Sequence, residues 1–297
     1  MSDIIKKRFF LAPLQQLLFL LDAKVKRELF DAASDITDCL NAGLLNRISE
    51  RLNNRNHQYR FICQHELDSK VISPSPMSSA SDIVVPQYYE EIIFHTRNIP
   101  TRPASWHDFF NGLVWASFPQ SKSLLNELHI AEIEAHGLHP RTKVRNHLTH
   151  FDECGVVLFV HCADLAAELR ELFSAQLWKT IFISHKDKWH NEIVPVIFGH
   201  ANYEMLLQPF IGLTAKVLIV NVENKLDTQH FAWEENSERY DDLLKSRLID
   251  DRVFHQSKPF YPLPLLGVPG WYEGSQNDEF YSNQHYFMPK RRKKCDA

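Results

Sequence analysis

Apolar residues recur mainly at helical spacing along this chain. Trp106, Phe110 and Leu113, for example, fall at positions i, i+4 and i+7, so they share one face of a helix. Pro119 would interrupt that helix and suits the first turn of the next one. The same spacing predicts helices over 14–52, 86–99, 106–117, 119–136, 163–175, 200–210 and 228–249.

The pattern changes in the second half of the chain. Residues 156–160 form a short apolar run rich in β-branched side chains, which predicts a buried strand. We expect a turn over 152–155 before it, with Gly155 at a positive φ. Further strand candidates are 59–63, 179–184 and 193–198, with another apolar element over 213–222, whereas the proline-containing tail from Lys258 predicts irregular structure. The predicted fold class is α+β, with a helical layer packed around a small mixed β-sheet.

A serine- and proline-rich stretch divides the chain. Residues 69–82 contain Pro74 and Pro76 among several serines, which is typical of a loop or linker. We therefore expect an N-terminal helical element over 1–68, the linker over 69–82, a main α+β domain over 83–289 and a basic tail over 290–297.

Charge and hydropathy narrow the class of protein. The 297 residues carry a formal net charge of −4, so the chain lacks the basic footprint of a dedicated duplex-DNA binder. Only the basic run over 290–297 could contact RNA or anionic lipid, and a frayed tail is the favoured interpretation of it. The apolar run over 9–21 is shorter than the ~20 residues that span a bilayer, so no transmembrane segment is expected.

Cysteine usage bears on the compartment. The five cysteines, Cys39, Cys63, Cys154, Cys162 and Cys295, are irregularly spaced and form no C-x-x-C pair. An odd count of this kind fits reduced thiols better than a disulfide framework, and we expect a cytoplasmic location.

The predicted helix over 106–117 carries the strongest candidate chemistry. Ser105 and Asp108 have the spacing of a capping box, in which each side chain accepts a hydrogen bond from the other residue's backbone N–H. Gly112 and Trp115 lie opposite the apolar face of the helix. A bare glycine often marks close approach of another group, so we expect this helix to be covered on two sides.

His107 and Asn111 would lie one turn apart, at the seam between the two covered sides. A seam that holds an imidazole, an amide and a nearby acid favours a pocket. A buried, hydrogen-bonded histidine with no chemistry is an equal alternative for His107. Trp115, Arg102 and Lys122 could complete the pocket, with the two cations binding an anionic substrate, although dispersed basic residues are usually only solvated.

A second candidate lies where a predicted strand meets a predicted helix. Residues 198–201 read Phe-Gly-His-Ala, which would place His200 at the carboxyl end of a strand, where ligands tend to bind. Glu204, one turn further, could orient this imidazole, but a satisfied core histidine is the favoured alternative. Asp152 and Glu153 could bind a metal, yet a turn acid is the commoner explanation, so no metal ligand is assigned.

Several of these segments together resemble one family. They are Thr101-Arg102, Trp106-His107-Asp108-Phe109-Phe110-Asn111, Phe151-Asp152-Glu153 with Gly155, Phe198-Gly199-His200-Ala201 and Leu266-Gly267-Val268-Pro269-Gly270-Trp271. The sequence resembles an uncharacterised family of unknown function, found mostly in proteobacteria. The resemblance implies no activity, cofactor or catalytic residue. The chain departs from the family pattern at Gly112, where alanine is usual, and at Asn146, where aspartate is usual.

The residues favour an enzyme, a hydrolase acting on an anionic small molecule or nucleotide. In this hypothesis His107 is the general base, and Asp108 or Glu204 orients an imidazole, with His200 as a further catalytic candidate. Arg102, Asn111, Trp115 and Lys122 would bind the substrate; the sequence implies no particular cofactor. The alternative is a non-catalytic binding or assembly protein, with tryptophans such as Trp271 serving as packing or partner contacts.

Overall fold

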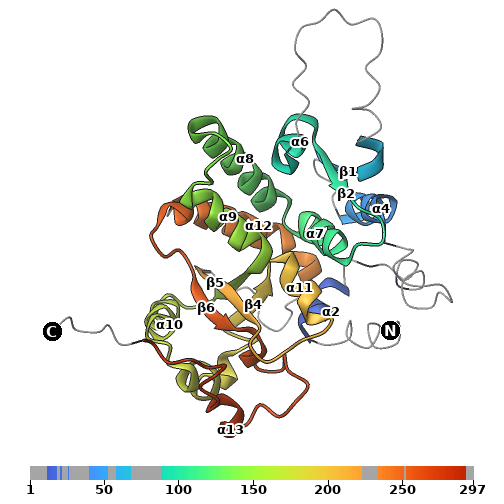
Figure 1. Cartoon of the computed structure of the whole chain (residues 1–297). Coiled ribbons are helices and arrows are strands. Elements are labelled where there is room, and N and C mark those ends of the chain that lie inside the picture. Colours follow the sequence, from blue (N-terminus) through green and yellow to red (C-terminus); the bar gives the residue numbers. More distant parts are fainter. Residues whose placement is uncertain are drawn as a thin grey trace, which may run out of the picture.

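The computed structural model describes residues 12–18, 21, 26, 40–52, 58–67, 88–222, 233–250 and 252–291. The expected linker over 69–82 lies outside the described residues, as does the basic tail beyond residue 291. Two small sheets are surrounded by helices, which confirms the predicted α+β class (Figure 1).

The larger sheet has four strands in the order β4-β3-β5-β6. β3 (Gly155–Val160) pairs parallel with β5 (Thr214–Asn221) and antiparallel with β4 (Ile193–Ile197). Every residue of β3 and β4 is buried, as expected of strands covered on both faces. The sheet is therefore mixed, as predicted.

The irregular tail expected after Lys258 is wrong in one part. β6 (Tyr261–Pro264) joins the sheet antiparallel to β5. It contains Pro262 and Pro264, and proline is tolerated at an edge position because its missing N–H is not needed by a further strand.

The second sheet pairs a strand that precedes the expected linker with a strand that follows it. β1 (Arg60–Cys63) pairs parallel with β2 (Asn98–Thr101), with Phe61 opposite Ile99. β1 lies in the N-terminal segment and β2 leads into the helix that carries His107. The N-terminal segment thus contributes directly to the surroundings of the candidate site.

Ten helices with α geometry surround these sheets in the described part of the chain. Figure 1 shows α8, α9 and α12 above the larger sheet, and α4, α6 and α7 grouped with β1 and β2. The bounds are α2 (Ala12–Leu18), α4 (Ala42–Leu52), α6 (Tyr89–Thr96), α7 (Trp106–Ser117), α8 (Pro119–His136), α9 (Lys143–Cys154), α10 (Ala163–Ala175), α11 (His200–Leu206), α12 (Trp233–Asp250) and α13 (Asp278–Tyr281). None of the helices that the structure describes combines the length and the apolar character that crossing a membrane requires.

The strand predicted over 179–184 is wrong. Thr180–Ser184 forms a short π-helix, separated from the end of α10 by residues 176–179. The neighbouring residues Ile181 and Phe182 are both buried while Ile183 is 37% exposed, so burial does not alternate as a half-buried strand requires. Phe182 also stacks on Trp178, four residues earlier, at a centroid separation of 6.2 Å.

The turn predicted over 152–155 is also wrong. α9 continues to Cys154, and Gly155 begins β3 with a φ of −69°. The glycine is required by crowding instead, because a Cβ there would collide with the carbonyl oxygen of Phe151. Gly199 approaches the same backbone, and the amides of Phe198 and Gly199 both donate to the Gly155 carbonyl, at 3.0 and 2.8 Å. Gly155, directly after α9, is therefore hydrogen-bonded to the two residues directly before α11.

α8 is fixed from outside by α12. The Asp241 carboxylate accepts hydrogen bonds from the backbone N–H groups of Gln120 and Ser121, at 2.7 and 2.9 Å. These are free donors of the first turn of α8, so Asp241 caps that helix across the tertiary structure. Pro119 occupies its first position, as predicted.

The expectation that α7 is covered on two sides is confirmed. α11 packs on one side, where Phe110 stacks on Tyr203 at 5.6 Å, and α4 packs on the other. A Cβ at Gly112 would overlap the side chain of Leu45 from α4. Gly112 thus lets the N-terminal segment approach the helix that carries the candidate site.

We predict that Gly112→Ala destabilises the protein by about 1–3 kcal/mol, the usual cost of overpacking a core, despite the better helix propensity of alanine. In a Leu45→Ala background the same substitution should be neutral or stabilising, because the overlapping side chain is gone. Urea unfolding of the four proteins of this double-mutant cycle measures the coupling. Equal effects of Gly112→Ala in both backgrounds would contradict the proposed contact.

Candidate active site

A pocket of about 400 Å³ opens between α6, α7, α8 and α9 and the start of α11. Seven of the eight residues singled out in the sequence line it: Arg102, His107, Asp108, Asn111, Trp115, Lys122 and His200. The eighth, Glu204, contacts one of these residues without lining the pocket itself.

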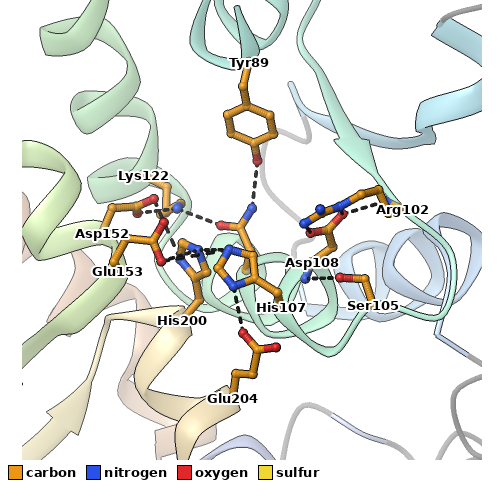
Figure 2. Close-up of polar contacts among 11 residues, drawn as sticks. Tyr89, Arg102, Ser105, His107, Asp108, Lys122, Asp152, Glu153, His200 and Glu204 are labelled. Carbon is orange, nitrogen blue, oxygen red and sulfur yellow. Dashed lines mark hydrogen bonds and ion pairs between the residues drawn. The ribbon is translucent and has the colours of Figure 1, made fainter. Parts of the chain in front are cut away.

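Two histidines that are 93 positions apart in the sequence meet in this pocket. His107 is in the first turn of α7 with 32% of its side chain exposed, and His200 begins α11 with 4% exposed. Their Nε2 atoms are 3.0 Å apart, and the rings cross at 79° (Figure 2). The junction of Gly199 with the end of α9 fixes where His200 can lie.

Glu204 orients an imidazole, but not the one expected. Its Oε2 lies 2.9 Å from Nδ1 of His107, so it bridges α11 to α7 and does not reach back to His200. The other side of the pair faces Glu153, whose Oε2 is 3.4 Å from Nε2 of His200 and 3.9 Å from Nε2 of His107. Figure 2 shows the two glutamates on opposite sides of the imidazole pair.

The Asp108 carboxylate forms hydrogen bonds and an ion pair with Arg102. The backbone N–H and Nε of Arg102 donate to Oδ2 of Asp108, at 2.6 and 3.0 Å, and its guanidinium also reaches Oδ1 at 2.7 Å. Ser105 Oγ accepts the Asp108 N–H at 3.2 Å, so only half of the expected capping box forms. Burial opposes ionisation of Asp108, but the hydrogen bonds from Arg102 lower its pKa. Two carboxylates are candidates to orient an imidazole. Glu204 does so, whereas Asp108 binds Arg102 at the start of α7.

The residues of α7 and α8 that are expected to bind substrate contact one another and neighbouring side chains instead. Lys122 is 3% exposed, and its Nζ donates to Asn111 Oδ1 at 2.9 Å and pairs with Asp152 Oδ1. Asn111 Nδ2 in turn donates to the Tyr89 hydroxyl at 2.7 Å. The Trp115 ring lies against the Lys122 ammonium, 5.3 Å from its centroid. Lys122 therefore neutralises a carboxylate of the protein and is not a free anion-binding group.

The electrostatics of the site follow from burial and from these pairs. Burial lowers the pKa of His200 to about 3, so this imidazole is neutral at pH 7. Burial opposes ionisation of Asp152, but the charge and hydrogen bond of Lys122 outweigh it and lower the pKa of this carboxyl. Burial raises the pKa of Glu153, which lacks such a cation partner in the described contacts.

Two functional candidates are misjudged at the sequence level. Asp152 and Glu153 are dismissed there as turn acids, yet they end α9 and both line the pocket. Tyr89 and His129 also line it and are not singled out at all. No helix is predicted over 143–154, where α9 lies, because the glycine that follows this segment suggests a turn. A helix there would have placed Thr149 and Glu153, four positions apart, on one face.

We predict that Lys122→Met lowers the free energy of unfolding by about 3–5 kcal/mol, because it leaves the Asp152 charge uncompensated. The double variant Lys122→Met/Asp152→Asn should lose clearly less. Arg102→Met is the comparison: the Arg102 side chain is 62% exposed, and Asp108 keeps the hydrogen bond from the backbone N–H of residue 102, so this variant should lose clearly less stability than Lys122→Met. Urea unfolding compares the four proteins, and equal losses for Lys122→Met and Arg102→Met would contradict this account.

Comparison with known proteins identifies only the family. Neither the curated proteins nor the solved structures contain a match to this chain. A family model described as a protein of unknown function, DUF3025, matches residues 78–291. This range includes the pocket residues from Tyr89 to His200, together with Glu204, and excludes α2, α4 and β1. Since the match covers well over half of the chain, the protein belongs to the DUF3025 family.

Proposed function

We propose that the protein is a hydrolase that acts on a small polar molecule bound in this pocket. One observation carries the proposal: the Nε2 atoms of His107 and His200 and a carboxylate oxygen of Glu153 converge at 3.0–3.9 Å. Three helices supply these groups, so the convergence is a property of the tertiary structure. Groups of these types, at hydrogen-bonding reach of one water, can take a proton from it.

The reaction adds water across a bond of the substrate. A water held by the cluster loses a proton to it as its oxygen attacks the electrophilic atom, and the leaving group departs with a proton from the cluster. Glu204 holds the ring of His107 through Nδ1, so Nε2 faces the water site. A fixed ring lowers the reorganisation needed during the reaction.

The charge of the pocket bears on the substrate. Two cations line it, Arg102 and Lys122, and each is already paired with a carboxylate. Lys122 is buried, whereas the exposed Arg102 guanidinium can still contact a ligand at the rim. A molecule with one anionic group fits this arrangement better than a nucleotide with several phosphates, and Arg102 is the residue we assign to bind it.

The non-catalytic alternative rests partly on the tryptophans. Trp115 and Trp271 are each 4% exposed, so they serve as packing residues and offer little surface to a partner. A scaffold would also have no need to gather two imidazoles and a carboxylate in a pocket. These observations favour the hydrolase.

We further propose that this hydrolase works in the bacterial cytoplasm. The bacterial origin follows the family resemblance of the sequence. The compartment is supported by the described cysteines, Cys63, Cys154 and Cys162, which are free thiols. Burial, followed by the Glu153 charge, raises the pKa of Cys154, so this thiol is a poor nucleophile.

We predict that His107→Ala lowers kcat/KM by about 10²–10⁴-fold, the usual contribution of a positioned acid–base group. The melting temperature should change by only a few degrees, since the side chain is partly exposed. A screen of chromogenic esters, amides and phosphoesters bearing one anionic group would supply the substrate.

His136→Ala is the matched control, because His136 is an exposed histidine at the end of α8. It should retain the wild-type kcat/KM. A large loss of stability in His107→Ala, with unchanged turnover in the folded fraction, would mark His107 as structural and contradict the proposal.

A further inference from the structure

The protons of the two imidazoles are directed away from the point where the rings meet. The His107 Nδ1 lies 2.9 Å from a Glu204 oxygen, which can only accept, so the ring proton belongs on Nδ1 and Nε2 keeps its lone pair. The His200 Nδ1 lies 3.8 Å from Oδ2 of Asp152, and a proton there is again favoured over a lone pair facing a carboxylate. Both Nε2 atoms then present lone pairs to each other.

A third electron-pair donor completes this cluster. Glu153 points its carboxylate at the same spot, 3.4 and 3.9 Å from the two Nε2 atoms (Figure 2). Two lone pairs 3.0 Å apart and a carboxylate repel one another unless a cation lies among them.

The separations match those around a bound metal ion. The three ligand atoms lie within 4.8 Å of one another. With edges of 3.0, 3.4 and 3.9 Å, a point equidistant from the three atoms is about 2 Å from each, and Zn²⁺ binds imidazole nitrogen and carboxylate oxygen at about 2.0–2.2 Å.

The surrounding residues have the arrangement of an outer ligand shell. Metal-binding histidines usually donate their other ring N–H to a carboxylate, which fixes the tautomer and the ring orientation. Glu204 stands in that position for His107, and the Asp152 carboxylate lies on the corresponding side of His200, with Oδ2 3.8 Å from Nδ1. Asp152 is itself anchored by the buried Lys122.

We propose that His107 and His200, through Nε2, and Glu153, through its carboxylate, bind one divalent transition-metal cation of the Zn²⁺ type. Two imidazoles and one carboxylate, without thiolate, form a ligand set that such ions accept. Three protein ligands leave at least one coordination position for water or substrate on the pocket side. The inference rests on the proposed function for the use of this site. With both Nε2 atoms on the cation, the cation would lower the pKa of the attacking water, in place of proton transfer to His107 Nε2.

Titration of the metal-free full-length protein with ZnCl₂, followed by calorimetry, tests the site. We expect one tight site per chain. His107→Gln and Glu153→Gln should each weaken binding at least 100-fold, and Glu204→Gln should weaken it about 10–100-fold, as expected for an outer-shell partner. Both ligand positions are partly exposed, so these variants should fold, which circular dichroism checks. His136→Gln should bind like the wild type and controls for the other histidines of the chain.

The outcomes separate this inference from the proposed function. Equal Zn²⁺ binding by wild type, His107→Gln and Glu153→Gln would assign the metal to surface histidines and overturn the site. Full turnover by chelator-treated, metal-free protein would overturn the use of the cation in the reaction while leaving the hydrolase in place. One tight, variant-sensitive Zn²⁺ site in a protein that hydrolyses nothing in the screen would support the site and contradict the hydrolase.

Discussion

The site depends on the ion pair between Lys122 and Asp152. Lys122 is 3% exposed, so its charge is tolerated only because Asp152 and Asn111 Oδ1 receive it. The pair joins α8 to the end of α9, and Asn111 extends it to α7. Asp152 in turn faces the inner nitrogen of His200. One charged pair thus fixes three helices and the electrostatic surroundings of the buried imidazole.

Close approach of backbone segments places Glu153 and His200 beside that pair. α9 runs into β3 without a loop, and Gly155 and Gly199 allow the start of α11 to lie against its last turn. Glu153 and His200 are consequently neighbours although 47 positions separate them. Gly112 makes similar room for Leu45 on the other side of α7.

Local patterns in the sequence predict much of the fold and part of the site. Helical spacing finds α7, α8 and α10, and the β-branched run finds β3, because each depends on nearest neighbours along the chain. The pocket around His107 is also predictable, since an imidazole and an amide at the edge of an apolar face signal a seam. The strand predicted over 179–184 is wrong because Ile181 and Phe182 are adjacent apolar residues. A short apolar run of this kind does not distinguish a buried strand from a buried helical turn.

Partnerships between distant residues cannot be read from those local patterns. Spacing alone pairs Glu204 with His200, one turn away, whereas the fold gives it to His107. In the sequence Arg102 and Lys122 look like free cations. The carboxylate that pairs with Lys122, Asp152, comes from elsewhere in the chain, and the one that pairs with Arg102, Asp108, is already explained as a helix cap. Nuclear magnetic resonance of ¹⁵N-histidine-labelled protein, recorded with one equivalent of Zn²⁺, tests the central claim most directly, because ring nitrogen shifts report the tautomer. We expect His107 and His200 both to carry the proton on Nδ1 with Nε2 bound to the cation; a proton on Nε2 of either ring would contradict the account.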